Sequence, residues 1–490
     1  MEERSTAFGW NWDNSYARLP ESLFSMQQPT PVSYPQFAVF NESLAKTLGL
    51  NIDALDSEEG AEILGGNALA VGSQPLAQAY AGHQFGHFTM LGDGRALLLG
   101  EHITPNGQRV DIQLKGAGRT PYSRGGDGRA ALGPMLREYI ISEALFGLGI
   151  PTTRSLAVVE TGEEVQRETR LPGAILTRVA DSHLRVGTFQ YAANWAGPEV
   201  LQQLVDYTIT RHYPAIAMDE QRTLELLKAV VKRQAKLISQ WQLVGFIHGV
   251  MNTDNMSISG QSIDFGPCAF MNAYDPDTVF SSIDRQGRYA YGNQPQIAGW
   301  NLARFAEALL PVLHADSSIA LEQAQDAVME FSAHYEQYWL QGMRAKLGLM
   351  NEQEDDKQLA FDLLAMMQHV KADYTNTFRD MTLQQWSSLA IAKHQNWQQW
   401  FDRWQQRIEG QSEDKQQSSN QMRSSNPVVI PRNHLVEEAL EAAVNEGDYE
   451  KLERFVSVLQ NPYRYDEQHG IYSEPPSEQL DCSYVTYCGT

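Results

Sequence analysis

The pattern of apolar residues changes near residue 195, and this change constrains the fold of the 490-residue chain more than any other feature. Before it, short apolar runs are separated by turn residues, as in β-hairpins. After it, apolar residues recur three and four positions apart over long segments, as in helices. A β-rich part followed by an α-rich part predicts an α+β fold with two lobes and a cleft between them.

A hairpin and a helix are predicted at the start of the β-rich part. Residues 95–103 and 109–115 are strand-like and flank a Thr-Pro-Asn-Gly turn signal. A helix follows over residues 134–148, where apolar side chains recur at helical spacing.

A second hairpin is predicted from residues 156–159 and 174–179. Thr161-Gly162 is its expected turn. In the α-rich part, helical spacing covers residues 220–244, 301–314, 319–347 and 357–371. Two short amphipathic helices are predicted near the C-terminus, over residues 435–444 and 449–459.

The net charge of the chain limits its partners. Asp and Glu number 60 against 38 Lys and Arg, a formal charge of -22, which repels a phosphodiester backbone and excludes nucleic acid as the main partner. The sequence has no run of about 18 apolar residues, so no membrane span is predicted. The first residues show no signal-peptide pattern, and three cysteines do not make a disulfide framework, so the cytoplasm is the expected compartment.

The residues after the long predicted helix carry the strongest local signal. They read His-Gly-Val-Met-Asn-Thr-Asp-Asn from His248 to Asn255, and Asp264 begins an Asp-Phe-Gly string nine residues later. Protein kinases carry H-x-D-x-x-x-x-N and D-F-G in this order. Asn and Asp offer the hard oxygen ligands that Mg²⁺ prefers. Asn255 and Asp264 are therefore predicted metal ligands, and His248 is expected to be a packed structural histidine.

The position of the usual kinase base is filled by Val250. Two interpretations stay open: the chain binds nucleotide without chemistry, or another carboxylate is the base. Asp254 lies beside Asn255 and is the substitute candidate, because a carboxylate next to a metal ligand can accept a hydroxyl proton. The alternative role of Asp254 is to cap a turn.

Lys115 ends a predicted strand, and Glu138 lies among apolar residues of the following helix. A strand lysine paired with a helix glutamate orients the phosphate-binding lysine of kinases. A buried carboxylate also needs a partner. We therefore predict a Lys115–Glu138 ion pair, against the alternative of a solvated lysine and a partly exposed glutamate.

Glycines and arginines in the β-rich part favour phosphate binding. Gly92 and Gly94 let backbone N–H groups approach phosphate, although the third glycine of G-x-G-x-x-G is absent and a plain tight turn is the alternative. Asp127-Gly128 lies in a second glycine-rich loop and is predicted to meet phosphate or metal. A guanidinium group can bind two phosphate oxygens at once. We therefore favour phosphate binding over surface ion pairs as the role of five arginines. These are Arg119, Arg124, Arg129, Arg178 and Arg185.

Two cysteines lie near the C-terminus. Cys482 and Cys488 can form a reversible disulfide, and two reduced thiols are the alternative. Cys268, just after the Asp-Phe-Gly string, is expected to be a small packed residue.

Several long strings resemble the selenoprotein O family, also called SelO or YdiU, of kinase-fold protein adenylyltransferases. The resemblance covers nearly the whole chain. The strings begin at Ala79 (AYAGHQFG), Leu91 (LGDGR), Gln113 (QLKGAG), Tyr122 (YSRGGDGR), His248 (HGVMNTDN) and Pro431 (PRN).

The resemblance implies a protein-kinase-like two-lobed fold that binds ATP in an orientation flipped relative to kinases. The α-phosphate is then the electrophile, and AMP passes to a Ser, Thr or Tyr hydroxyl of a protein. By position, Asp254 is the implied proton acceptor and Asn255 and Asp264 are the implied Mg²⁺ ligands, with Mn²⁺ suited to the same oxygens. The implied ATP contacts are Gly92, Gly94, Arg95, Lys115, Asp127, Gly128, Arg178, Arg185 and Asp264.

The resemblance also places Cys488 where relatives carry a redox-active Cys or selenocysteine, with Cys482 as its candidate partner. The alternatives to AMP transfer are phosphotransfer of the kinase type and a pseudokinase scaffold that binds nucleotide without chemistry. The expected segments are an N-terminal extension packed on the lobes (1–80), a nucleotide-binding N-lobe (81–190), a C-lobe with the catalytic and metal-binding loops (191–408), a flexible linker (409–427), and C-terminal helices with the redox tail (428–490).

Overall fold

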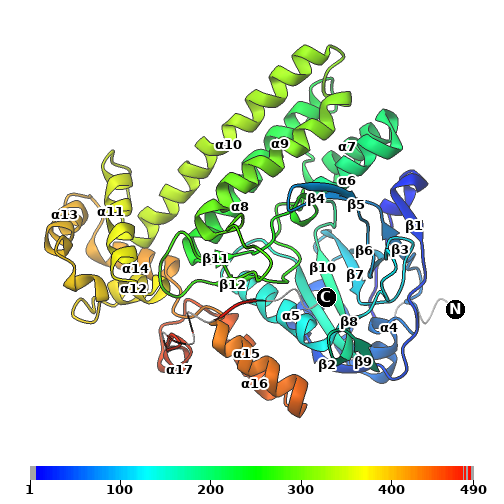
Figure 1. The fold of residues 1–490 in the computed structure, drawn as a ribbon, viewed down its shortest axis with the longest axis horizontal. Coiled ribbons are helices and arrows are strands. Elements are labelled where there is room, and N and C mark those ends of the chain that lie inside the picture. The colour runs from blue at the N-terminus through cyan, green and yellow to red at the C-terminus, as the bar shows by residue number, and fades with distance from the viewer. Residues whose placement is uncertain (1–6, 478, 480, 482–483, 487–490) are drawn as a thin grey trace.

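The computed structural model describes residues 7–477, 479, 481 and 484–486. Figure 1 shows a sheet-containing lobe in the N-terminal part of the chain and a helical lobe that follows it. This is the two-lobed α+β arrangement that the change of pattern near residue 195 predicts.

An antiparallel sheet of eight strands forms the first lobe, in the order β1-β3-β6-β7-β10-β9-β2, with β8 paired to β10. β6 (Ala96–Ile103) and β7 (Arg109–Lys115) are the first predicted hairpin, and Ala96 lies opposite Lys115. The first 80 residues supply three strands, so they contribute to the sheet and do not only cover it. The other strands are β1 (Phe24–Met26), β2 (Gln36–Phe40), β3 (Leu76–Gln78), β8 (Ala130–Ala131), β9 (Arg154–Gln166) and β10 (Arg170–Ala180).

The second predicted hairpin is present, but its turn was assigned wrongly. β9 continues through Thr161-Gly162 to Gln166, and the chain reverses over residues 167–169. Gly162 has φ +68°, and the register with β10 shifts nearby, between Pro172 and Ala174. A glycine with positive φ suits a β-bulge as well as a turn, so the Thr-Gly signal alone could not distinguish the two.

Helix α5 (Leu132–Gly147) lies between the sheet and the C-terminal helices (Figure 1). Leu136 and Ile140 belong to one buried cluster with Leu176 of the sheet and Val436 of the C-terminal segment. A helix covered on two sides needs apolar residues around most of its circumference. This explains why Glu138 of α5 is buried in an otherwise apolar setting.

The second lobe is built on α8 (Arg222–Val244), which packs against α9 (Gln294–Leu313) and α10 (Ser317–Lys346). Leu227 and Ile238 of α8 lie in the same apolar cluster as residues of both neighbours. The remaining helices are α2 (Glu42–Leu48), α3 (Ile52–Leu55) and α4 (Glu58–Leu64) beside the sheet, and α6 (Val186–Tyr191), α7 (Pro198–His212), α11 (Asp356–His369), α12 (Tyr374–Thr382), α13 (Trp397–Glu409) and α17 (Glu467–Ile471).

Residues 409–427, expected to be a flexible linker, are instead largely helical: they contain α14 (Lys415–Ser425). Asp414 and Gln417 form a capping box in which each side chain accepts from the other residue's backbone N–H. Met422 of this helix is buried in the second lobe. Polar composition indicated a linker because it does not reveal which side chains cap a helix.

The C-terminal segment contacts both lobes. α15 (Asn433–Glu441) and α16 (Glu450–Leu459) pack on α5 through Val436 and Phe455. Arg432, fully buried, donates to Asp373 Oδ2 of the helical lobe at 2.6 Å. The segment therefore joins the sheet side of the molecule to the helical side.

Of the three cysteines, Cys268 is among the described residues. Cys268 is buried, as expected for a packed residue. Cys482 and Cys488 lie outside the described residues, so their disulfide stays a prediction. Within the described part of the chain, no helix is both long and apolar enough to cross a membrane.

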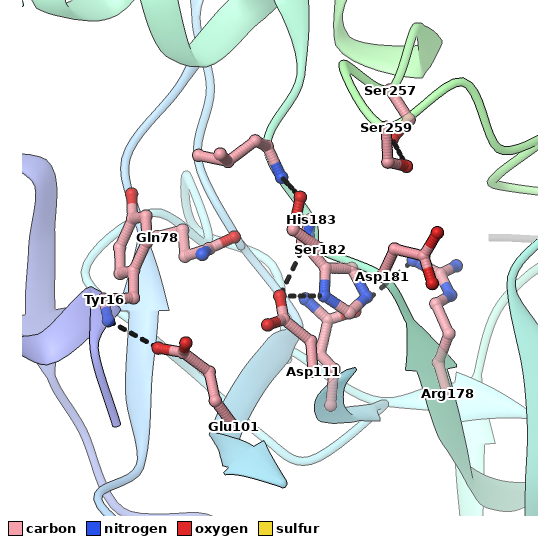
Figure 2. Close-up of polar contacts among 12 residues, drawn as sticks. Tyr16, Gln78, Glu101, Asp111, Arg178, Asp181, Ser182, His183, Ser257 and Ser259 are labelled. Atoms are coloured by element: carbon pink, nitrogen blue, oxygen red, sulfur yellow. Dashed lines mark hydrogen bonds and ion pairs between the residues drawn. The ribbon is translucent and has the colours of Figure 1, made fainter. Parts of the chain in front are cut away.

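Buried charges connect β7 to the segment that leaves the sheet. Asp111 Oδ2 accepts from the backbone N–H of His183 at 2.9 Å and is hydrogen-bonded to its Nδ1 at 2.9 Å (Figure 2). Arg211 of α7 pairs with both Asp111 and Glu101. These contacts hold the residues after β10 in place, and from this segment Arg185 reaches the space between the lobes.

Candidate active site

A cleft of about 1370 Å³ gathers side chains from both lobes. Its wall includes strand ends of the sheet, α5, and the loops that follow α8. Arg119, one of the five predicted arginines, does not line it. The predicted residues in its wall are Gly92, Gly94, Arg95, Lys115, Asp127, Gly128, Glu138, Arg178, Arg185, Asp254, Asn255 and Asp264.

Glu138 lies between two cations at the back of the cleft. Lys115 Nζ donates to Glu138 Oε2 at 2.6 Å, and Arg178 Nε donates to Oε1 at 2.8 Å. All three side chains are buried. Burial alone would raise the pKa of Glu138, but Arg178 and Lys115 outweigh it and lower the pKa. The strand lysine and helix glutamate are thus brought together, with a buried arginine as a third member.

Asp264 is surrounded by three cations. Its Oδ1 accepts from Arg178 at 2.7 Å and from Lys115 at 3.3 Å, and its Oδ2 accepts from Arg185 at 3.0 Å. Burial opposes ionisation, but these cations hold the pKa of Asp264 well below its ordinary value. The residue has φ +64°, in the left-handed region that non-glycine residues rarely adopt and that clusters at functional sites. Asp264 is therefore an ionised carboxylate held in a strained backbone position.

Asp254 lies in a short turn, Thr253–Asn255, near Asp264: Arg185 donates both to the backbone oxygen of Asp254 and to Asp264 Oδ2, each at 3.0 Å. It is buried, and its Oδ1 has no hydrogen-bond partner among the described residues. Burial raises the pKa of Asp254 to about 6, although Arg185 acts to lower it. A Cβ on Gly82 would lie 2.2 Å from this Oδ1, so only glycine leaves it room. The carboxylate is thus buried, confined and available as a proton acceptor.

The donor set fits a hard divalent cation. Asn255 Oδ1 is buried without a partner in the described structure, and Asn255 Nδ2 lies 3.3 Å from Asp264 Oδ2. Within the described residues no group of three His, Cys, Asp or Glu side chains could hold a metal. Two protein oxygen donors suit Mg²⁺, which keeps waters and phosphate oxygens as its other ligands.

The glycines before β6 are explained by loop packing. Gly92 has φ +96°, and a Cβ there would lie 2.4 Å from the Tyr122 ring. A Cβ on Gly94 would lie 2.9 Å from Tyr122 O. Asp127, in the second loop, is ion-paired with Arg167 at 2.8 Å. Both loops border the cleft, and glycine lets them pack closely together.

The predicted arginines that line the cleft differ in burial and in the groups that they contact. Arg178 and Arg185 are buried and reach Asp264. Arg129 instead donates to the backbone oxygens of Thr30 and Pro31, although it borders the cleft. Arg124 also lines the cleft.

Several cleft residues were not singled out from the sequence, among them Asp93, Phe85 and Asn252. Asp93 is buried between the glycines, with Arg185 at 4.0 Å, and burial raises its pKa to about 6. Phe85 N donates to Asn252 Oδ1 at 3.0 Å. This bond joins the hairpin of β4 (Ala81–Gln84) and β5 (His87–Met90) to the loop that carries Asp254. The flanking glycines of Asp93 were the available signal.

His248 is a packed structural residue, as expected. It is buried, and its ring Nε2 is hydrogen-bonded to Ile263 O at 2.8 Å. Ile263 stands just before the Asp-Phe-Gly string, so this hydrogen bond joins the two loops.

The fold and the site together define a class: a two-lobed α+β protein whose cleft is lined by buried cations and carboxylates from both lobes. A family model described as "Protein adenylyltransferase SelO" matches residues 7–460. The chain belongs to this family.

Curated relatives agree over nearly the full length. The chain is 61% identical to a protein named protein nucleotidyltransferase YdiU from Geobacillus kaustophilus, over 98% of this chain and 99% of that protein. It is 63% identical to the protein of the same name from Anoxybacillus flavithermus, with the same coverage. Among solved structures, ROP2 from Toxoplasma gondii, described as a virulence factor with a protein-kinase fold and no enzymatic activity, matches 53% of this chain and 87% of its own at 9% identity. The TM-score of 0.26 is too low to support any inference.

Proposed function

We propose that the chain transfers AMP from ATP to Ser, Thr or Tyr hydroxyls of proteins. The single observation that carries the proposal is Asp254: its buried, unpartnered carboxylate oxygen faces the cleft beside Asn255, while Val250 fills the usual kinase base position. Membership of an adenylyltransferase family supports AMP rather than phosphate as the transferred group.

The proposed reaction gives the carboxylate, the cations and the metal-ligand residues of the cleft separate roles. The substrate hydroxyl oxygen attacks the α-phosphorus of ATP, the bond between the α-phosphorus and the bridging oxygen breaks, and pyrophosphate leaves. Asp254 takes the hydroxyl proton. Lys115, Arg178 and Arg185 bind phosphate oxygens and stabilise the charge that develops on them. Asn255 and Asp264 would hold Mg²⁺ or Mn²⁺, which neutralises phosphate charge.

Intact-mass measurement after incubation with Mg-ATP and a lysate protein fraction tests the proposal. We expect AMP-sized adducts with the wild type, none with Asp264→Ala, and at least a hundredfold slower labelling with Asp254→Asn, since general-base catalysis is worth about 10²–10⁴-fold. Asp402→Asn, an exposed aspartate of α13, is the matched control and should label normally.

Three outcomes would contradict the proposal. Phosphate-sized adducts would favour kinase-type transfer. Full labelling by Asp254→Asn would remove Asp254 from the role of base, and absence of labelling by every variant and the wild type would favour a nucleotide-binding scaffold.

A further inference from the structure

A second hollow of about 640 Å³ adjoins the cleft, and Phe85 and Ile283 line both. Its wall comes from the segment after the Asp-Phe-Gly string and from the start of α9. None of its residues belongs to the phosphate and metal machinery described above. We call it the arginine hollow.

The hollow is positively charged in a strongly acidic chain. Arg285 is exposed and Arg288 is half-buried, and neither forms an ion pair with a described carboxylate. Asp284, the carboxylate in the wall, accepts instead from the backbone N–H groups of Arg288 at 2.9 Å and Tyr289 at 2.7 Å. The Arg288 guanidinium is held 5.0 Å from the centre of the Trp300 ring. The two arginines therefore outnumber the single acidic side chain of the wall, and neither is ion-paired with it.

An aromatic strip runs from the hollow across the β4–β5 hairpin. The ring of His83 lies 5.2 Å from Trp300 and 4.8 Å from Phe88, and Phe88 stacks on Trp195 at 5.6 Å. Phe88 is 41% exposed and Trp195 is 48% exposed. Exposed aromatic side chains that lie side by side are typical of a surface that binds a protein chain.

The hollow is connected to the proposed base by short contacts. Tyr289 O–H donates to Asn252 Oδ1 at 2.7 Å, and the same oxygen accepts from Phe85 N. Asn252 stands two residues before Asp254. A peptide seated in the hollow would therefore lie within a few residues of a hydroxyl placed at Asp254.

We infer that the arginine hollow binds an acidic stretch of the protein substrate, close in sequence to the modified hydroxyl. This rests on the proposed function. Guanidinium groups bind carboxylates bidentately. The chain as a whole carries a formal charge of -22, so a local excess of arginine beside the cleft favours an acidic segment at this place.

Peptide binding measured without ATP tests the inference independently of the chemistry. Two fluorescent peptides share one central serine and the same apolar residues; one has Asp and Glu at the flanking positions and the other has Asn and Gln. By fluorescence anisotropy we expect the wild type to bind the acidic peptide about tenfold more tightly, with the difference shrinking as salt rises. We expect Arg285→Gln/Arg288→Gln to bind both peptides equally weakly.

Arg454→Gln is the matched control, because Arg454 is an exposed arginine of α16 and should leave the preference unchanged. Equal binding of the two peptides by the wild type, or a salt-independent preference, would overturn the inference without any variant. A preference retained by the correctly folded double variant would overturn it too.

AMP transfer to the same peptides separates the two proposals. Charge-dependent binding without any AMP adduct would contradict the proposed function and leave the hollow as an acidic-peptide site. AMP transfer that ignores peptide charge, together with equal binding, would support the function and overturn the hollow.

Discussion

At the scale of single residues, Glu138 does more than pair with Lys115. Its two oxygens hold Lys115 and Arg178, and both cations in turn contact Asp264. One carboxylate of α5 therefore sets the position of the cations that would meet phosphate. A buried charge with two partners is tolerated only while both remain.

We predict that Glu138→Gln lowers both stability and activity. Lys115 and Arg178 would then share Asp264 as their remaining carboxylate partner, and breaking a buried ion pair costs about 3–5 kcal/mol in the free energy of unfolding. AMP transfer should fall about a hundredfold because Lys115 and Arg178 lose their orientation. Urea unfolding and labelling rates measure the two effects.

Glu450→Gln is the control for this substitution, because Glu450 forms an exposed ion pair with Arg454. It should change stability by less than about 1 kcal/mol and leave labelling intact. A Glu138→Gln protein with wild-type stability and rate would contradict the orienting role.

Much of the cleft could be predicted at this scale, and the reason is local. Lys115 and Asp264 stand in short strings whose spacing reports their place on a strand end and a loop. Asp93 and Trp300 gave no comparable signal, because their surroundings are created by segments far apart in the sequence. Burial of Asp93 beside Arg185 becomes visible only after folding.

At the scale of elements, the β4–β5 hairpin lies over the turn that carries Asp254. His83 N donates to Thr253 Oγ1 at 2.8 Å, and Gly82 faces the Asp254 carboxylate. The hairpin thus forms one wall around the proposed base, and its glycine sets how close the two segments come.

We predict that Gly82→Ala slows AMP transfer while ATP still binds. The added Cβ would displace the Asp254 carboxylate, and a shift of about 1 Å can cost a hundredfold in rate. The cations around Asp264 do not touch Gly82, so nucleotide affinity should change by less than about threefold. Labelling rates and ATP titration by calorimetry measure the split.

The control is Gly470→Ala, since a Cβ there meets no atom within 4 Å. Equal loss of rate and of ATP affinity in Gly82→Ala would point to general disruption rather than to displacement of Asp254.

Helix α10 ends on a buried lysine. Burial lowers the pKa of Lys346 from its usual 10.5 to about 7. The rings of Phe378 and Tyr374, at 4.2 and 5.5 Å from Nζ, offset part of the cost of its charge. Between pH 7 and 10.5 the unfolded chain therefore binds more protons at this site than the folded chain.

We predict that the free energy of unfolding rises with pH above 7 through Lys346, and that Lys346→Met removes this rise. Methionine should also stabilise the protein at pH 7 and below by about 2–4 kcal/mol, because no buried charge is needed. Urea unfolding of both proteins at pH 6.5 and 9 gives the comparison. Lys357 is a half-exposed lysine of α11, and the Lys357→Met control should keep the wild-type increase of the free energy of unfolding with pH. The same increase in Lys346→Met would contradict the assignment to Lys346.

Elements with strong periodicity, such as α8 and the β6–β7 hairpin, could be predicted because the pattern comes from one buried face. The turn of the β9–β10 hairpin and helix α14 could not. The turn depends on a register shift between β9 and β10, and α14 depends on its capping box. Composition alone reveals neither feature.

At the scale of the whole molecule, Arg432 joins the C-terminal segment to the helical lobe. Its guanidinium contacts Asp373, which also caps α12 through Asn376 N, and it donates to Ser473 O at 3.0 Å. A few residues later the chain reaches α5 on the other lobe. One buried arginine therefore anchors a segment that spans both lobes.

We predict that Arg432→Met destabilises the protein by about 3–5 kcal/mol, since the Asp373 carboxylate loses its cationic partner. Loss of the anchor should also broaden the unfolding transition, because the two lobes then unfold less cooperatively. Calorimetry and urea unfolding monitor both. Arg464→Met removes an exposed ion pair and is the control, and an unchanged midpoint in Arg432→Met would contradict the anchoring role.

The covering of α5 by α15 and α16 has a consequence for biosynthesis. A ribosome completes the sheet and α5 long before it makes residues 433–459, so during that interval the face of α5 that α15 and α16 contact has no cover. Domains at the N-terminal end generally fold first during synthesis. Here the first lobe has to wait for the last helices, and the nascent chain is exposed to chaperones and to aggregation until they arrive.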